Sequence, residues 1–378
     1  MRTIDSGELK LRPVSESIGA AFPPASLFPD FSPALFEEAP VVGSAAYYSA
    51  EKDRLVSSIH GWLFRLGGKL VLVDTGRGRH QDKGVAGAPF FVSLAAAGAT
   101  PDDIDMVLLT HLHTDHMKNS TLPDGDGWRP AFPNARYLVG RREYAHWQAG
   151  GGGLGLYPQQ SAVMREAVAP IREAGLLDLI DDDAAILPGL RAMPVPGHTA
   201  TQLAFVLESG GNTFLFAADS FHHPLQVHRP QWGSSLCEDG QAAYRTRLSL
   251  LDFCAQNGVA LLASHFGGSH AGLVHRAVAA MLAHARPAAP VSLETGEAAA
   301  LDPKALSSPS QALANVTRAV VGLCDTVEVM LKTVMELYEE PDRARMTALA
   351  ALDDRVDRRH AAIKLYLARI KTRAMNDD

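Results

Sequence analysis

Three histidines and an aspartate lie within six consecutive positions, and side chains of these types bind metal ions. They are His111, His113, Asp115 and His116, and they follow the apolar run Met106–Leu109 almost directly. Such a run predicts a buried strand, and functional side chains of α/β proteins gather where strands end. Imidazole nitrogens and carboxylate oxygens suit borderline cations such as zinc. The cluster therefore predicts a metal site at a strand end.

Three more side chains of the same types follow later segments that also predict strands. They are His198, Asp219 and His265. Five histidines and two aspartates suit two metals that share a bridging carboxylate and a hydroxide. We therefore expect two divalent ions per chain. Zinc is the expected metal, and iron and manganese are alternatives because they accept the same ligands.

The elements that must position these residues alternate between strand-like and helix-like patterns. Residues 59–66 and Lys69–Val73 flank Gly67-Gly68 and predict a hairpin. Residues 241–256 predict an amphipathic helix that ends before a glycine. Mixed elements of this kind predict an α/β body in which sheets lie between helices. Further strands are expected at 106–109, 136–139, 190–195, 203–207, 213–217 and 259–263, and further helices at 90–97, 141–148 and 161–174.

The motifs, taken in their order along the chain, resemble those of the metallo-β-lactamase-fold hydrolases. The resemblance covers about residues 40–275 and implies an αββα sandwich, which we assign to residues 57–286. The matching pieces are Val73-Asp74-Thr75-Gly76, Thr110-His111-Leu112-His113-Thr114-Asp115-His116, Pro196-Gly197-His198-Thr199, Ala218-Asp219-Ser220 and Ser264-His265.

The same resemblance implies a role for each candidate ligand. The first metal takes His111, His113 and His198. The second takes Asp115, His116 and His265, while Asp219 bridges the two. By the same resemblance, Asp74 lies beneath the metals and orients the ligand loop, and the alternative is a plain turn-forming aspartate.

Three further stretches look like the branch that holds N-acyl-homoserine lactonases and methyl-parathion-hydrolase-like enzymes. They are 131–147 (AFPNARYLVGRREYAHW), 221–232 (FHHPLQVHRPQW) and 244–253 (YRTRLSLLDF). The implied reaction is the opening of a lactone or related carboxylic ester by a metal-bridging hydroxide, with Asp115 as general base. Three residues after the bridging aspartate, where the lactonases have a tyrosine, this chain has His222, followed by His223. Either could donate a proton in the reaction, and the alternative is that both are structural.

The composition limits the classes of protein to which the chain can belong. Its 378 residues carry 42 acidic and 35 basic side chains, and the resulting charge of −7 argues against a nucleic-acid partner. The three cysteines are far apart and predict neither disulfides nor a thiolate zinc site. No apolar run reaches the roughly 18 residues of a membrane span, and the N-terminus has no signal-peptide core. A cytoplasmic protein with a small-molecule substrate is expected.

The sequence on either side of the α/β body has a different character. Residues 1–56 are rich in proline and aromatics, and we expect an extended segment that wraps the body. Residues 287–310 are rich in proline, alanine and serine and predict a linker. Residues 311–373 carry two long amphipathic patterns and predict an all-α helical hairpin that resembles PhoU-type helices. We expect the hairpin to serve in a homodimer or in docking, and the alternative is phosphate-linked regulation.

Two other functions remain open on the sequence alone. A phosphotriesterase or arylesterase would use the same ligands, because the pocket walls select the substrate. A metal-binding sensor or scaffold that acts through the helical tail would bind the ions without hydrolysis.

Overall fold

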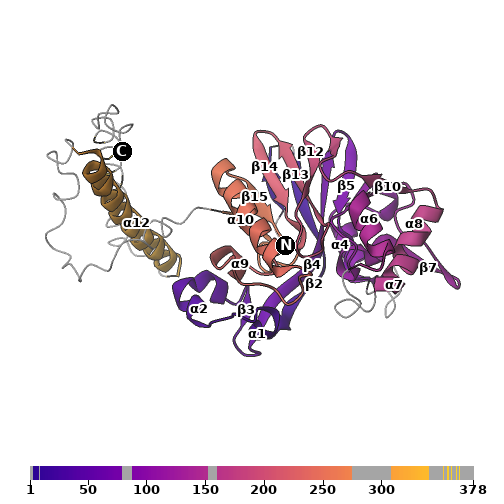
Figure 1. Cartoon of the computed structure of the whole chain (residues 1–378), viewed down its shortest axis with the longest axis horizontal. Coiled ribbons are helices and arrows are strands. Elements are labelled where there is room, and N and C mark those ends of the chain that lie inside the picture. The colour runs from indigo at the N-terminus through magenta and orange to yellow at the C-terminus, as the bar shows by residue number, and fades with distance from the viewer. Residues whose placement is uncertain are drawn as a thin grey trace. The chain divides into compact units, whose positions relative to one another are not determined.

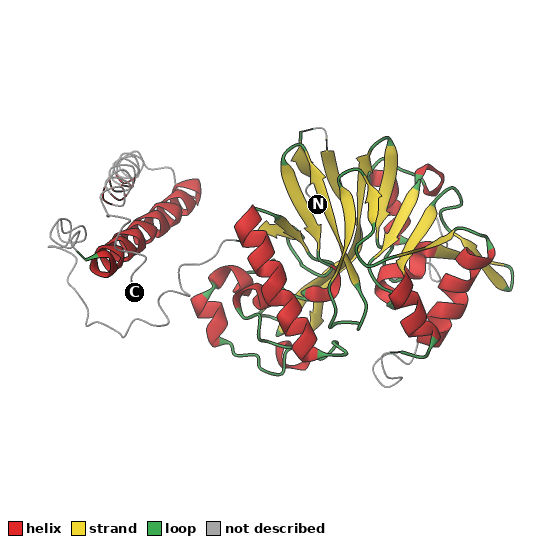
Figure 2. Ribbon diagram, turned by 45° about the horizontal axis from the view of Figure 1, so that its top comes forward, coloured by secondary structure: helices red, strands yellow, loops and turns green. Residues whose placement is uncertain are grey.

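The computed structural model describes residues 3–7, 9–78, 87–151, 160–274 and 308–339, and also 352, 356, 359, 363 and 366. The chain divides into two compact units, Met1–Arg276 and Ala277–Asp378. In the first unit, two large sheets face each other and helices cover both outer faces (Figure 1, Figure 2). This is the predicted αββα sandwich, which the structure confirms.

The first sheet combines the N-terminal strands with a parallel core. Its strands are β1 (Ile4–Ser6), β2 (Leu9–Phe22), β4 (Arg54–Leu66), β5 (Lys69–Val73), β6 (Met106–Leu109), β9 (Arg136–Gly140) and β10 (Leu177–Ile180) in spatial order, with β3 (Tyr48–Ser49) beside β4. The predicted hairpin is formed by β4 and β5, and both turn glycines have positive φ, which glycine adopts without a steric cost. From β5 to β10 the strands run parallel, so their carboxyl ends share one edge. A small separate hairpin consists of β7 (Thr121–Asp124) and β8 (Gly127–Pro130).

The second sheet is mostly antiparallel, with six strands in the described residues. They are β11 (Ala185–Leu187), β12 (Leu190–Pro194), β13 (Leu203–Ser209), β14 (Asn212–Phe216), β15 (Ala260–Leu262) and β16 (Ala271–Leu273). The parallel pair β14 and β15 is connected by the predicted amphipathic helix, α10 (Gly240–Asn257). Asp239 caps the start of α10 by accepting hydrogen bonds from two backbone N–H groups, and Gly258 ends the helix at φ +61°.

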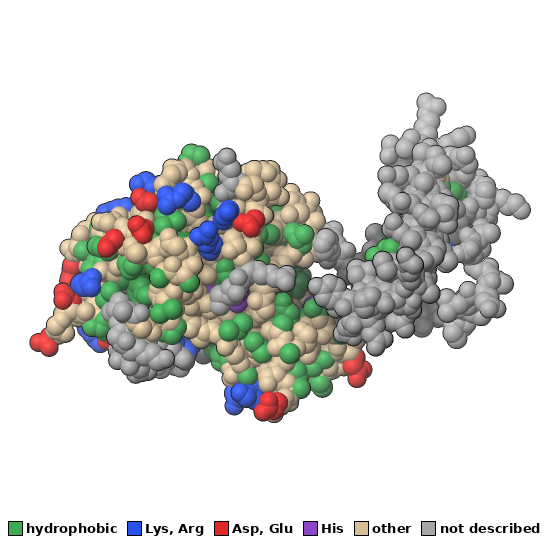
Figure 3. Space-filling model, turned by 180° about the vertical axis from the view of Figure 1, so that it is seen from behind, with side chains coloured by type: hydrophobic (Ala, Val, Ile, Leu, Met, Phe, Trp, Pro, Cys, Tyr) green, Lys and Arg blue, Asp and Glu red, His purple; other side chains and the backbone are tan. Residues whose placement is uncertain are grey.

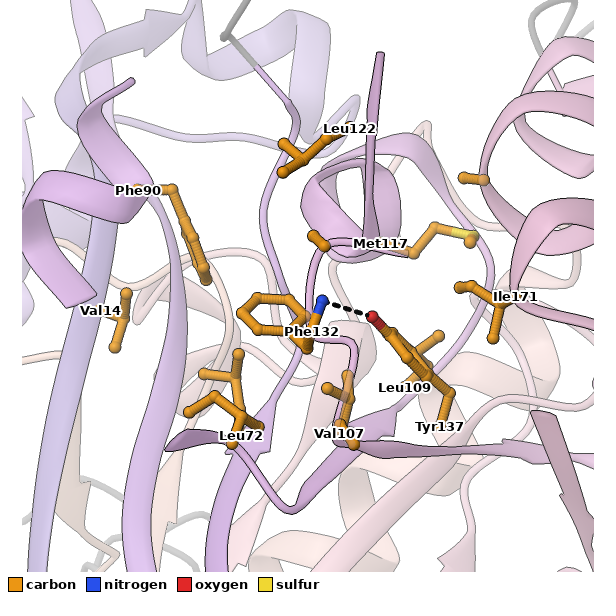
Figure 4. Packing of buried hydrophobic residues seen from close by; sticks show 14 of the residues in the cluster. Val14, Leu72, Phe90, Val107, Leu109, Met117, Leu122, Phe132, Tyr137 and Ile171 are labelled. Atoms are coloured by element: carbon orange, nitrogen blue, oxygen red, sulfur yellow. Dashed lines mark hydrogen bonds between the residues drawn. The ribbon is translucent and has the colours of Figure 1, made fainter. Parts of the chain in front are cut away.

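Alternating side chains along the strands explain the four layers. In β5, Leu70 and Leu72 join a core with the outer helices, whereas Val71 and Val73 join the core between the two sheets. The first of these cores includes residues from α4 (Pro89–Ala96), α6 (Arg141–Gln148), α7 (Gln160–Val163) and α8 (Ala169–Glu173). Figure 4 shows Leu72 of the sheet with Phe90 and Ile171 of the helices in this core. A third core lies between the second sheet and α10.

The N-terminal residues differ from the expected wrapping segment. The strand β2 pairs with β4 from Arg12 opposite Leu63 to Phe22 opposite Leu55, so this part of 1–56 is integral to the first sheet. The register shifts at Glu16 and again near the end of the strand. Each shift reverses which side chains face the core, and the alternation expected of a strand is therefore hidden in the sequence.

The second unit contains one long described helix, α12 (Pro309–Glu339). Ala312 and Val316 of this helix are buried with Ile363 and Tyr366 from later in the chain. Most of the predicted linker 287–310 and most of the expected second helix lie outside the described residues. Among the helices that the structure does describe, none combines the length and apolar character that crossing a bilayer requires. On the face of the first unit seen in Figure 3, acidic and basic side chains are interspersed.

Candidate metal centre

All seven predicted ligands come together where strands of both sheets end. The first four follow β6, at the start of the short helix α5 (Thr114–Met117). His198 follows β12, Asp219 lies in the turn after β14, and His265 follows β15. Six of the seven side chains are buried, and Asp115 remains about one-quarter exposed at 25 %. The residues brought together are His111, His113, Asp115, His116, His198, Asp219 and His265.

Three of the histidines form a first ligand group. His111 Nε2 lies 3.0 Å from His113 Nδ1, which lies 2.8 Å from His198 Nε2. Ligand nitrogens about 2.0–2.1 Å from a tetrahedral zinc are about 3.3 Å apart. The observed spacings are close to this value, so the three nitrogens fit one borderline cation.

A second ligand group lies beside the first. His116 Nε2 is 4.0 Å from Asp115 Oδ1, and His265 Nε2 is 3.8 Å from Asp115 Oδ2. The three candidate ligand atoms all lie within 4.8 Å of one another. Two nitrogens and a carboxylate also form a donor set that suits zinc, iron or manganese.

Asp219 contacts histidines of both groups. Its Oδ1 is 3.2 Å from His116 Nε2, and its Oδ2 is 3.0 Å from His265 Nε2 and 3.3 Å from His198 Nε2. Among the described residues, no hydrogen-bond partner reaches Asp219 Oδ1, although this oxygen is buried. A buried carboxylate oxygen in this state fits a cation ligand, because a buried acceptor without a hydrogen-bond donor is otherwise costly.

Three of these groups, His113, His198 and Asp219, have the charge state that a metal ligand requires. Burial lowers the pKa of His113 and of His198 to about 3, so both imidazoles are neutral. Burial alone would raise the pKa of Asp219. The surrounding imidazoles lower it by a larger amount, so the pKa lies well below its usual value. The opposite holds for His116, whose pKa is raised by Asp219 and Asp74 in spite of its burial. Metal binding would therefore displace a proton from His116.

Contacts behind the ligands fix their ring orientations. His116 Nδ1 lies 2.8 Å from Asp74 Oδ2, and Asp74 Oδ1 accepts a hydrogen bond from the backbone N–H of Thr110 at 2.9 Å. His265 Nδ1 lies 2.9 Å from the carbonyl oxygen of Ser58. When Nδ1 donates in each case, the Nε2 lone pair points into the site. The structure thus places Asp74 beneath the ligand loop, with a backbone φ of +57°.

The neighbouring histidines 222 and 223 have different surroundings. His222 is buried, and its Nε2 is 3.6 Å from Asp219 Oδ2. Neither of its ring nitrogens makes a hydrogen bond within the part of the chain that the structure describes. His223 Nε2 contacts the carbonyl of Tyr47 at 2.9 Å, and its Nδ1 accepts from the N–H of Leu225. Both nitrogens of His223 are therefore occupied by backbone groups. This geometry does not support His223 as a proton donor and favours the structural alternative.

The sequence analysis did not identify Glu143, which contacts the loop of His111 and His113 and the loop of His198. It lies within the stretch 131–147, on the face of α6 that also buries Tyr144 and Trp147. An acidic residue on the apolar face of an amphipathic helix is the signal that could have found it.

Replacing Gly197 by alanine is expected to destabilise the protein by more than about 2 kcal/mol and to weaken metal binding. The φ of Gly197 is +136°, and an added Cβ would lie 2.2 Å from the backbone nitrogen of Ala243 in α10. His198 follows directly, so the displaced backbone would carry a ligand with it. Thermal unfolding and metal titration measure the two effects. Gly233→Ala is the matched control, because a Cβ there meets no atom within 4 Å. Equal stability of the two variants would contradict this account.

Comparisons with known proteins agree with this geometry. The family model described as the metallo-beta-lactamase superfamily matches residues 56–265, which is more than half of the chain. A search of curated protein sequences gave no match.

Several solved structures share the fold. The hydrolase AbOPH of the beta-lactamase superfamily has a TM-score of 0.61 at 23 % identity and covers 73 % of this chain and 93 % of its own. AidC, a dizinc quorum-quenching lactonase in complex with its product, has a TM-score of 0.60 at 22 % identity, with coverages of 72 % and 92 %. A probable metal-dependent hydrolase from Staphylococcus aureus has a TM-score of 0.56 at 19 % identity, with coverages of 69 % and 91 %. The chain belongs to the metallo-beta-lactamase superfamily.

Proposed function

We propose that this protein is a dinuclear-metal hydrolase that opens a lactone or a related carboxylic ester. The observation that carries the proposal is the carboxylate of Asp219, which contacts histidines of two adjacent ligand groups. The likeness in fold to AidC, which is described as a dizinc lactonase, supports this substrate class. Two divalent ions bound here would supply a hydroxide nucleophile at neutral pH and polarise the substrate carbonyl.

Seven side chains would hold the two ions, and one of them would also act as general base. The first ion would be held by His111, His113 and His198, and the second by Asp115, His116 and His265. Asp219 would bridge the two ions. Asp115 would also act as general base, because its side chain is the most exposed of the ligands. Burial alone would raise the pKa of Asp115. His116 and His265 lower it by a larger amount, so the pKa is below its usual value. The carboxylate is therefore ionised and can accept a proton.

His222→Phe is expected to lower kcat about a hundredfold without changing the metal content, because His222 would stabilise the departing alkoxide. Burial lowers the pKa of His222 well below its usual value, so the neutral ring has one N–H to donate. Steady-state kinetics and elemental analysis measure the two quantities. His228→Phe is the control, since His228 is exposed at the end of α9 (Leu225–His228). An unchanged kcat in His222→Phe would show that His222 is structural.

The test of the proposed function combines elemental analysis with a substrate screen. Lactones, aryl esters and phosphotriesters are compared with and without a chelator. We expect two ions per chain and lactone opening that the chelator abolishes. Faster turnover of a phosphotriester or an aryl ester would favour the alternative hydrolase. Two ions without any hydrolysis would favour a sensor or scaffold, and a chain without metal would contradict the ligand assignment.

A further inference from the structure

Glu143 is a fully buried carboxylate on α6. No lysine, arginine or histidine among the described residues lies within ion-pair distance of it. Burying an acid without a cationic partner is costly unless hydrogen bonds satisfy its oxygens. Burial raises the pKa of Glu143 above its usual value in spite of the hydrogen bonds it accepts. A carboxylate buried in this way therefore depends on the hydrogen bonds that it accepts.

The Glu143 carboxylate accepts four hydrogen bonds. Oε1 accepts from the backbone N–H of Leu112 at 3.1 Å and from Trp147 Nε1 at 2.6 Å. Oε2 accepts from the hydroxyls of Thr199 at 2.8 Å and Thr201 at 2.6 Å. Each oxygen therefore accepts two bonds, and the capacity of the carboxylate is filled.

Three of the four donors come from the two loops that carry the first ligand group, and the fourth, Trp147, lies on α6 itself. Leu112 lies between His111 and His113 in the loop after β6, whereas Thr199 follows His198 in the loop after β12. These strands belong to different sheets. The peptide groups of Leu112 are held on both sides, because its carbonyl also accepts from Gln160 Nε2 at 2.6 Å.

We propose that Glu143 is the positioning residue of the first ligand group: it ties the loop of His111 and His113 to the loop of His198, so that their nitrogens are set for one ion. The inference rests on the metal site of the proposed function. Glu143 forms no described hydrogen bond to the second group, in which His116 is oriented by Asp74 and His265 by Ser58. Removing Glu143 therefore weakens one metal position and leaves the other.

The experiment compares two substitutions at this position. Glu143→Leu keeps much of the volume but removes all four acceptors. Glu143→Gln keeps an oxygen for Leu112 and Trp147, while its NH₂ group can donate to the threonine hydroxyls, which can reorient to accept. We expect Glu143→Leu to lose about 10- to 100-fold in affinity at the first position, and Glu143→Gln to stay within about threefold of wild type.

Zinc titration against a chromophoric chelator gives the two affinities, and anomalous diffraction at limiting zinc gives the occupancy of each position. Glu173→Leu, at an exposed site on α8, controls for the change of a glutamate to leucine. If Glu143→Leu does not fold, Thr199→Val removes one of the four bonds, and a selective loss of at least about threefold is expected.

The outcomes separate this inference from the proposed function. Two ions bound equally tightly in wild type and in Glu143→Leu, or in Thr199→Val where that variant is needed, would overturn the role of Glu143 alone. Equal losses at both positions would also overturn it, since a general structural defect has no preference for the first. A wild-type chain that binds no zinc would overturn the proposed function and this inference with it.

Discussion

Replacing Asp219 by asparagine is expected to lower the metal content from two ions to at most one and lactone hydrolysis by more than about a hundredfold. Asp219 is the carboxylate that contacts His116, His198 and His265. The substitution keeps the size of the side chain and removes its charge. In the proposed site, two cations held close together would then lose the anion between them, and His116 would lose one of the three carboxylates that face it.

Elemental analysis and kcat/KM on a lactone measure these two losses. Asp183→Asn makes the same chemical change at an exposed position between β10 and β11 and should leave both quantities unchanged. An Asp219→Asn variant with two tightly bound ions and at least one-tenth of the wild-type rate would contradict the bridging role.

Asp74→Ala is expected to lower the free energy of unfolding by about 3 kcal/mol and the metal affinity of the second position by about 10- to 100-fold. The carboxylate accepts hydrogen bonds from the N–H and the hydroxyl of Thr110, and His116 Nδ1 donates to it. Alanine leaves the buried N–H groups of Thr110 and His116 without these acceptors. It must also adopt φ +57°, which aspartate and asparagine tolerate better than alanine does.

Urea unfolding of the metal-free protein isolates the first effect, and zinc titration measures the second. Asp74→Asn separates backbone from side-chain causes, since asparagine tolerates the same φ but offers only one acceptor oxygen. We expect its stability to lie between those of wild type and Asp74→Ala. An alanine variant with wild-type stability and affinity would show that Asp74 only forms a turn.

The local elements could be predicted because their signals are local. The hairpin of β4 and β5 follows from two glycines between apolar runs, and β6 follows from four consecutive apolar residues. The strand β2 could not be predicted, because the extra residue Glu16 reverses its alternation partway along. Its place beside β4 depends on pairing with residues 33 to 51 positions later, which no local pattern encodes.

The candidate site shows the same limit. The spacing of the ligand motif indicates a metal site because the chemistry requires those residue types together. The adjacent His222 and His223 are indistinguishable in sequence, yet only His223 has both nitrogens bonded to backbone groups. Glu143 was missed for a related reason, since its partners Leu112, Thr199 and Thr201 come from two distant loops.

The candidate metal ligands come from both sheets, so they meet only after the two sheets have packed together. His111 and His113 follow a strand of the first sheet, whereas His198, Asp219 and His265 follow strands of the second. An unfolded or half-folded chain holds these groups far apart, so a metal ion would not gain its full set of ligands before the sheets dock. Bound ions would then stabilise the native state more than the transition state for folding. We expect zinc to slow unfolding and to leave the refolding rate nearly unchanged, so that bound metal prolongs the lifetime of the folded enzyme.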